Sequence, residues 1–216
     1  MCGRITQFDK EKYAERYDVK PGPSFDATPH WNVAPGQYAP VITHEDVAMM
    51  KWGLTPWYVK DSEVGKARKL INAMAEGIGE KTTFKHALRE RRCIVPASGF
   101  YEWRSGQPYY FHPAGEVVFS LAGLYEVRKD AEGRNYQTFC IVTTKPNGVA
   151  APIHNRMPAI LTREDERVWL DPDQDDPAVL LPLLRPYSDD LMAVYACNPL
   201  VGNVRNDGPE LLEPVG

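Results

Sequence analysis

The chain has 216 residues, a formal net charge of −4 at pH 7 and a hydrophobic fraction of 43%. This length predicts one sizeable domain, residues 1–216, with two small domains as the alternative. The slight acidic excess argues against a protein that coats nucleic acid through its overall charge, because neutralising phosphates requires clustered lysine and arginine. We find no run of about 18 apolar residues and no signal-peptide pattern, so we expect a cytoplasmic protein with reduced thiols.

The first half of the chain alternates short elements with loops. Residues 9–19 (DKEKYAERYDV) predict a short helix with Asp9 as its N-cap. The proline-rich residues 21–40 are expected to be mostly loop, with a turn at NVAPG. Residues 40–54 predict two strands around a polar turn, and residues 82–92 predict a helix opened by threonine caps.

The second half is rich in strand patterns. Four successive segments combine β-branched and aromatic residues with glycine-containing turns: CIVPASGFYEW, PYYFHP, VVFSLAGLYEV and QTFCIVTT. Sequential strands favour an α+β fold with a curved antiparallel sheet or partial barrel over β-α-β units. Residues 162–171 then predict a helix with a capping box of Thr162 and Asp165, residues 177–185 a proline-interrupted helix, and residues 191–201 a strand.

One of the four cysteines stands apart from the others. Cys93, Cys140 and Cys197 lie in apolar strand-like segments, where cysteine is typically a small buried hydrophobic residue. Their spacing fits no zinc motif, so we expect no metal and no cofactor. Cys2 follows the initiator Met1, whose removal would leave an amine and a thiol on neighbouring carbons. Such a 1,2-aminothiol can close a ring on an aldehyde; alternatively, Cys2 begins a buried first strand.

Three further polar residues stand in apolar surroundings. They are Asn72 in KLINAMAEG, Glu102 in SGFYEW and His154 in APIHNRMPAIL. Each also has an ordinary structural explanation, namely a cap, an outward-facing strand residue and a loop histidine. Taken singly, none of the three indicates a function.

With the motifs around them, these residues make the chain resemble the SRAP (SOS response-associated peptidase) family, which includes abasic-site processing proteins of bacteria and vertebrates. The matching motifs follow the family's order along nearly the whole chain: MCGR, WNVAPG, KWGLTPW, INAMAE, CIVPASGFYEW, VTT, IHNRMPAIL and VGNVRNDGPELL. The resemblance implies a single SRAP domain over residues 1–216, with peripheral helices on the curved sheet and no appended domain.

The resemblance implies an enzyme that crosslinks itself to abasic sites in single-stranded DNA. The Cys2 amine would attack the ring-opened aldehyde to form an imine, and the Cys2 thiol would then close a thiazolidine that protects the lesion from strand cleavage. The two nucleophiles ordinarily titrate at about 8 and about 8.5. Glu102, among aromatic residues, is expected to have a raised pKa suited to proton transfer. His154 would assist sugar opening and crosslink reversal, and Asn72 would orient the amine or the sugar.

The resemblance also implies contacts with DNA. Arg4 and Arg156 match family positions that would hold phosphates beside the active site. Trp57 and Tyr58 offer flat faces on which unpaired bases can stack, a contact worth about 1–3 kcal/mol per base. Trp52, inside an apolar strand, is expected to pack in the core.

One position departs from the family pattern. Where the family commonly has arginine after Asn-Ala, this chain has Met74, so a phosphate-binding arginine is missing. Arg68 and Lys69, a few residues upstream, are candidates to replace it. We expect weaker or differently placed DNA contacts with the chemistry intact.

Two other functions remain open. MCG also begins the class II glutamine amidotransferases, in which an N-terminal cysteine attacks the amide of glutamine; here RITQF follows rather than a glycine-rich stretch. A non-catalytic reader of damaged DNA is the second, and for it Cys2 would be dispensable. Removal of Met1, by self-cleavage or by a host aminopeptidase, underlies the word peptidase in the family's name. The expected partner is single-stranded DNA containing abasic sites, and no membrane contact is expected. We expect the protein to be a monomer associated with the bacterial nucleoid.

Overall fold

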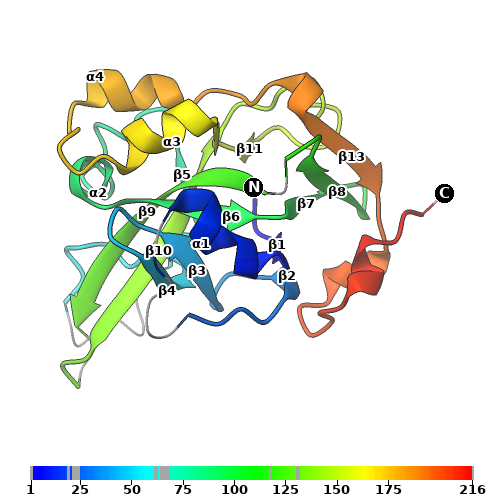
Figure 1. The fold of residues 1–216 in the computed structure, drawn as a ribbon, viewed down its shortest axis with the longest axis horizontal. Coiled ribbons are helices and arrows are strands. Elements are labelled where there is room, and N and C mark those ends of the chain that lie inside the picture. The colour runs from blue at the N-terminus through cyan, green and yellow to red at the C-terminus, as the bar shows by residue number, and fades with distance from the viewer. Residues whose placement is uncertain are drawn as a thin grey trace.

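Two β-sheets with short helices around them form the structure (Figure 1). This computed structural model describes residues 2–18, 20, 25–60, 63, 69–116, 118–129 and 132–215. The expected α+β fold, built on a curved sheet or partial barrel with peripheral helices, is confirmed. No helix among these residues is long and apolar enough to cross a membrane.

The larger sheet closes into a ring of five strands. In chain order they are β3 (Tyr38–Ile42), β4 (Val47–Trp52), β6 (Arg92–Ala97), β9 (Phe119–Lys129) and β10 (Asn135–Thr144). The ring runs from β10 through β4, β3, β6 and β9 back to β10. A ring with an odd number of strands cannot alternate direction throughout, and β4 and β10 accordingly pair in parallel. The local patterns predict a wholly antiparallel sheet, and this detail is wrong for the pair of β4 and β10.

Three short strands extend the ring at β9 and β10. They are β5 (Asn72–Met74), β11 (Met157–Pro158) and β12 (Ile160–Leu161). Strand β5 runs parallel to β10, whereas β11 pairs antiparallel with β10 and β12 pairs antiparallel with β9. The end of β10 therefore lies between β5 and β11, and it brings two distant parts of the chain together.

The smaller sheet is antiparallel and has five strands. In spatial order they are β13 (Met192–Ala196), β8 (Gln107–Pro113), β7 (Gly99–Arg104), β1 (Ile5–Gln7) and β2 (His30–Val33). Strand β1 lies between β2 and β7, so the start of the chain is inside the fold. Strand β2 falls within residues 21–40, where loop was expected. That expectation is wrong there because β2 forms by pairing with β1, a contact that local sequence does not reveal.

The helices lie around the sheets (Figure 1). Helix α3 (Arg163–Leu170) begins with the predicted capping box. The Asp165 main-chain N–H donates to the Thr162 hydroxyl oxygen, and the Thr162 main-chain N–H donates to the Asp165 carboxylate. The remaining helices are α1 (Tyr13–Tyr17), α2 (Lys85–Glu90) and α4 (Pro177–Leu180). Short 3-10 turns cover Lys10–Lys12, Leu181–Leu183, Asp189–Leu191, Pro199–Gly202 and Pro209–Leu212.

Two predicted helix starts are wrong in detail. Asp9 makes no side-chain capping bond, and the chain after it forms a 3-10 turn before α1. Helix α2 begins after Phe84, with no side-chain cap, rather than at the threonines ahead of it. Both helices are short, so packing rather than capping decides where they begin.

All four cysteines are buried in the described structure. Cys93, Cys140 and Cys197 are core residues, as predicted, and so is Trp52, whose indole N–H donates to the Ile71 carbonyl oxygen. Cys2 is fully buried as well. The second residue of this chain therefore belongs to the packed interior rather than to a ragged end.

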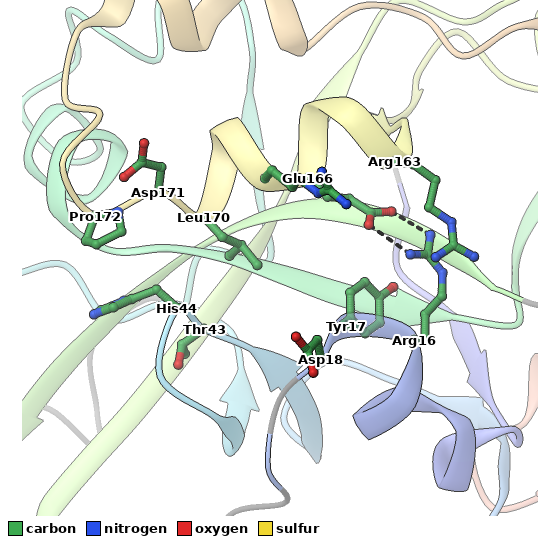
Figure 2. Close-up of a pocket in the computed structure, with 11 residues that line it drawn as sticks. Arg16, Tyr17, Asp18, Thr43, His44, Arg163, Glu166, Leu170, Asp171 and Pro172 are labelled. Atoms are coloured by element: carbon green, nitrogen blue, oxygen red, sulfur yellow. Dashed lines mark hydrogen bonds and ion pairs between the residues drawn. The ribbon is translucent and has the colours of Figure 1, made fainter.

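A polar depression of about 580 Å³ lies between α1, the turn joining β3 to β4, and α3 (Figure 2). Arg16 and Glu166 face each other there and form two hydrogen bonds of 2.9 and 2.6 Å. Ser120 donates to the same carboxylate and also bonds the Tyr17 hydroxyl. Because its most buried charges neutralise each other, this network fixes α1 against α3.

A candidate active site around Cys2

Cys2 lies just ahead of β1, with its side chain fully buried. Its carbonyl oxygen accepts a hydrogen bond of 3.0 Å from Asn72 Nδ2. Burial raises the pKa of the Cys2 thiol far above its usual range, and the negative charge of Glu102 raises it further. The thiol is therefore neutral, and it becomes a strong nucleophile only when a base removes its proton.

Asn72 reaches Cys2 because β5 pairs with β10, which aligns Asn72 with Ile141. The Asn72 amide nitrogen bonds the Cys2 carbonyl and also lies 3.5 Å from the Ile141 carbonyl oxygen. Its Oδ1 atom is buried and accepts no hydrogen bond from any residue described. An unused acceptor therefore lies beside the start of the chain, where an N–H group could bind it.

Glu102 stands in the middle of β7 and is 4% exposed. Burial raises the pKa of Glu102, while the positive charge of a protonated His154 opposes that shift. Its Oε2 atom lies 3.9 Å from His154 Nε2. The raised pKa expected for Glu102 is confirmed, and such a carboxyl keeps its proton to a higher pH than an exposed one, which suits it to proton transfer.

His154 follows a turn in which its main-chain N–H donates to the Ala150 carbonyl. Its Nδ1 atom accepts a hydrogen bond of 3.1 Å from the Arg156 main-chain N–H. The other ring nitrogen, Nε2, faces Glu102. Cys2, Asn72, Glu102 and His154, which the chain carries far apart, thus converge through β1, β5, β7 and the segment before β11.

The two predicted phosphate-binding arginines, Arg4 and Arg156, both form hydrogen bonds within the protein. Arg4 donates to Asn32 Oδ1 and to the Val201 carbonyl oxygen, each at 2.6 Å, and its guanidinium lies 5.6 Å from the ring centre of Trp103. Burial lowers the pKa of Arg4. Arg4 therefore links β1 to β2 and to the C-terminal segment.

Trp57 and Tyr58 are 39% and 56% exposed and contact each other edge to face, with ring centres 5.8 Å apart. Trp57 Nε1 donates to the Thr82 carbonyl oxygen, which holds its ring on the segment before α2. Of the two residues proposed to replace the missing arginine, Arg68 lies outside the described residues. Lys69 donates to Thr55 Oγ1 at 2.8 Å and lies over the Tyr136 ring.

A groove of about 600 Å³ runs between Tyr58 and Asn72. Met74, 43% exposed, contributes apolar surface to it, and Lys69 and Lys81 contribute positive charge. Lys81 was missed in the sequence, because its approach to the groove depends on the turn after β5. Among the described residues, no group of three His, Cys, Asp or Glu side chains could hold a metal ion.

The fold and the site define a protein that presents a buried cysteine, a carboxyl and an imidazole beside an open groove. Residues 1–204 match the family model of the SOS response associated peptidase (SRAP), and the chain belongs to this family. It is 39% identical to the abasic site processing protein YoqW of Bacillus subtilis over 99% of both chains. It is 30% identical to the abasic site processing protein HMCES of Gallus gallus, covering 87% of this chain and 66% of that one. An X-ray structure of a protein from Bacteroides thetaiotaomicron, 31% identical, matches with a TM-score of 0.89 over 99% of this chain and 100% of that one.

Proposed function

We propose that this protein processes abasic sites in single-stranded DNA by crosslinking itself to them through Cys2. The observation that carries the proposal is the convergence of Cys2, Asn72, Glu102 and His154 beside a groove. The names of the relatives support the same lesion as substrate. Two nucleophiles on one residue suit an aldehyde, which an abasic deoxyribose presents when its ring opens.

The reaction begins with hydrolysis of the Met1–Cys2 peptide bond, which frees the Cys2 amine. The amine adds to the aldehyde carbon, and loss of one water gives an imine. The thiol sulfur then bonds the imine carbon while its proton passes to the imine nitrogen, which closes the thiazolidine. The adduct weighs as much as protein plus oligonucleotide less one water, and no oxidant or cofactor takes part.

Each of the four residues has its own role in the proton transfers and hydrogen bonds of the proposed reaction. A free ammonium group next to the Cys2 thiol favours the thiolate, which opposes the effect of burial. Glu102, with its raised pKa, donates a proton to the departing hydroxyl and accepts one from the amine. His154 serves the opening of the sugar, with Nε2 toward Glu102, and the unused Oδ1 of Asn72 accepts from the amine.

The DNA strand extends from this site along the groove toward Tyr58. Stacking on an exposed aromatic ring does not depend on base identity, so it suits a lesion that can occur anywhere in a sequence. Met74 contributes apolar contact where the family commonly has arginine, and Lys81 supplies a positive charge for a phosphate in the same groove. DNA binding therefore combines stacking of bases on aromatic rings with contacts between lysine side chains and phosphates.

Replacing Tyr58 by alanine is expected to weaken binding of an undamaged single strand about tenfold, because one base loses its stacking partner. Fluorescence anisotropy with a labelled oligonucleotide measures this loss. Tyr38→Ala is the matched control, since Tyr38 is also 56% exposed and lies on β3, outside the groove. Equal affinities of the two variants would contradict the proposed path of the strand.

Intact-mass measurement tests the proposed function directly. We expect purified protein to lack the mass of Met1, and to gain one oligonucleotide less one water after incubation with a uracil-glycosylase-treated single strand. The same oligonucleotide without glycosylase treatment is the control and should give no adduct. Binding without a mass shift would favour a non-catalytic reader, and release of ammonia from glutamine would favour an amidotransferase.

A further inference from the structure

Glu76, two residues beyond β5, forms an ion pair with Arg156 that the chemistry above does not use. Arg156 Nη1 and Nη2 each donate to one carboxylate oxygen of Glu76 at 2.8 Å. The Arg156 side chain is 13% exposed, whereas that of Glu76 is 44% exposed. Two parallel hydrogen bonds between a planar guanidinium and a carboxylate fix the orientation of both groups.

The pair spans the end of β10. Arg156 Nη2 also donates to the Thr143 carbonyl oxygen at 2.6 Å, and the same oxygen accepts the main-chain N–H of Ala75. Thr143 is paired with Met74 of β5 on one side and with Pro158 of β11 on the other. The Glu76–Arg156 pair therefore joins the segment that carries Asn72 to the segment that carries His154.

The main chain of Arg156 holds the imidazole of His154 in an unusual way. His154 Nδ1 lies 3.1 Å from the Arg156 main-chain nitrogen and 3.1 Å from the Arg156 carbonyl oxygen. When Nδ1 carries no proton, it accepts from the N–H; when it is protonated, it can donate to the carbonyl. Nε2, on the side of Glu102, is then respectively a proton donor or a proton acceptor.

We propose that Glu76 is a positioning residue, which holds Arg156 so that its main chain supports both tautomers of His154. The inference rests on the proposed function of His154 in proton transfer. An imidazole that acts first as an acid and later as a base must change tautomer, and a partner for each form keeps either state from losing a hydrogen bond. The carboxylate of Glu76 bonds Arg156, and through Arg156 it acts on His154.

The charge of Glu76 is part of this role. Its hydrogen bonds from Arg156 lower the pKa of Glu76, so it is ionised at neutral pH. Without Glu76, the Arg156 guanidinium keeps Thr143 as its partner, and its buried Nε has none among the described residues. Held through Thr143 alone, the guanidinium can rotate about that contact, and the main chain at residue 156 is then less firmly positioned.

The test compares Glu76→Ala with Glu116→Ala. Glu116 is a suitable control because it also pairs with an arginine, Arg163, and is 47% exposed. At saturating abasic single strand, we expect Glu76→Ala to crosslink about tenfold more slowly, since small losses of positioning cost large factors in rate. Glu116→Ala should crosslink at the wild-type rate.

A spectroscopic measurement separates positioning from a general loss of structure. ¹⁵N NMR of labelled imidazoles, in protein without DNA, reports which nitrogen of His154 carries the proton. We expect wild-type protein to populate both the Nε2–H and the Nδ1–H forms, and the ratio of the two forms to change in Glu76→Ala. Glu76→Gln, which keeps one acceptor for Arg156, should lie between wild type and Glu76→Ala and serves as the test if alanine lowers the melting temperature.

Two results would overturn the inference. One is a wild-type crosslinking rate in both Glu76 variants. The other is a slower rate with an unchanged His154 spectrum, which would mean that Glu76 acts elsewhere. If wild-type protein forms no adduct at all, the proposed function fails, and the DNA-free spectra still show whether Glu76 controls the His154 tautomer.

Discussion

A protein in which Cys2 is replaced by alanine is expected to form no SDS-stable adduct with an abasic single strand. It should still form an adduct that cyanoborohydride traps. Once a host aminopeptidase has removed Met1, this variant carries a free amine at residue 2, so the imine can form, but without sulfur no ring can close. The imine hydrolyses on denaturation unless it is reduced. Denaturing gels run with and without the reductant therefore separate the role of the amine from that of the thiol.

The matched control for this variant is Cys197→Ala. Cys197 is also fully buried, but it lies beyond β13 in a separate cluster with Tyr101 and Tyr110. We expect the stable adduct to form at the wild-type level in this control. A stable adduct in Cys2→Ala would show that another side chain is the nucleophile, and the proposed chemistry would be wrong.

Local sequence was a good guide to elements that form by local rules. Strands β7 to β10 were predictable because their strand patterns are separated by short turns, and β7 pairs with β8 and β9 pairs with β10 as sequence neighbours in hairpins. The capping box of α3 was predictable because both partners, Thr162 and Asp165, lie within one turn. Contacts of this kind need no knowledge of the rest of the chain.

The parts that could not be predicted depend on distant pairing. Strand β2 forms only against β1, and the ring closes only where β10 meets β4 in parallel. Asn72 contacts Cys2 across 70 positions of sequence, a closeness that no spacing rule indicates. The candidate site was recognised from motifs, and the geometry that joins its residues comes from the fold.

The same limit applies to charge. The sequence predicts Arg156 to be a phosphate ligand, yet its two terminal nitrogens bind Glu76, the last residue of the INAMAE motif, to which the sequence assigned no role. Lys81 was overlooked for a similar reason, since its place in the groove follows from the turn between β5 and α2. A sequence shows which charges a chain carries, and only the fold shows which of them are already paired.

Replacing Glu102 by glutamine is expected to lower the crosslinking rate by about 10²–10⁴-fold, the usual contribution of a positioned acid or base. Glutamine keeps the size of the side chain and removes its proton transfer. The measurement is a single-turnover rate with excess protein. Glu126→Gln is the control, since Glu126 is also buried and has a raised pKa but pairs with Arg91 outside the site. Similar losses in both variants would contradict a role specific to Glu102.

Glu102→Gln should also raise the free energy of unfolding. The pH dependence of this effect follows from the direction in which the Glu102 pKa is shifted. Burial raises the pKa of Glu102 in the folded protein, so its contribution to stability is complete below the unfolded pKa of about 4.3 and is lost as pH rises through the folded pKa. Each unit of difference between the two values is worth about 1.4 kcal/mol. Urea unfolding should therefore find Glu102→Gln close to wild type near pH 4 and more stable near pH 8. A stability difference that does not change with pH would mean that the carboxyl titrates normally, and Glu102 would then lack the property that suits it to proton transfer.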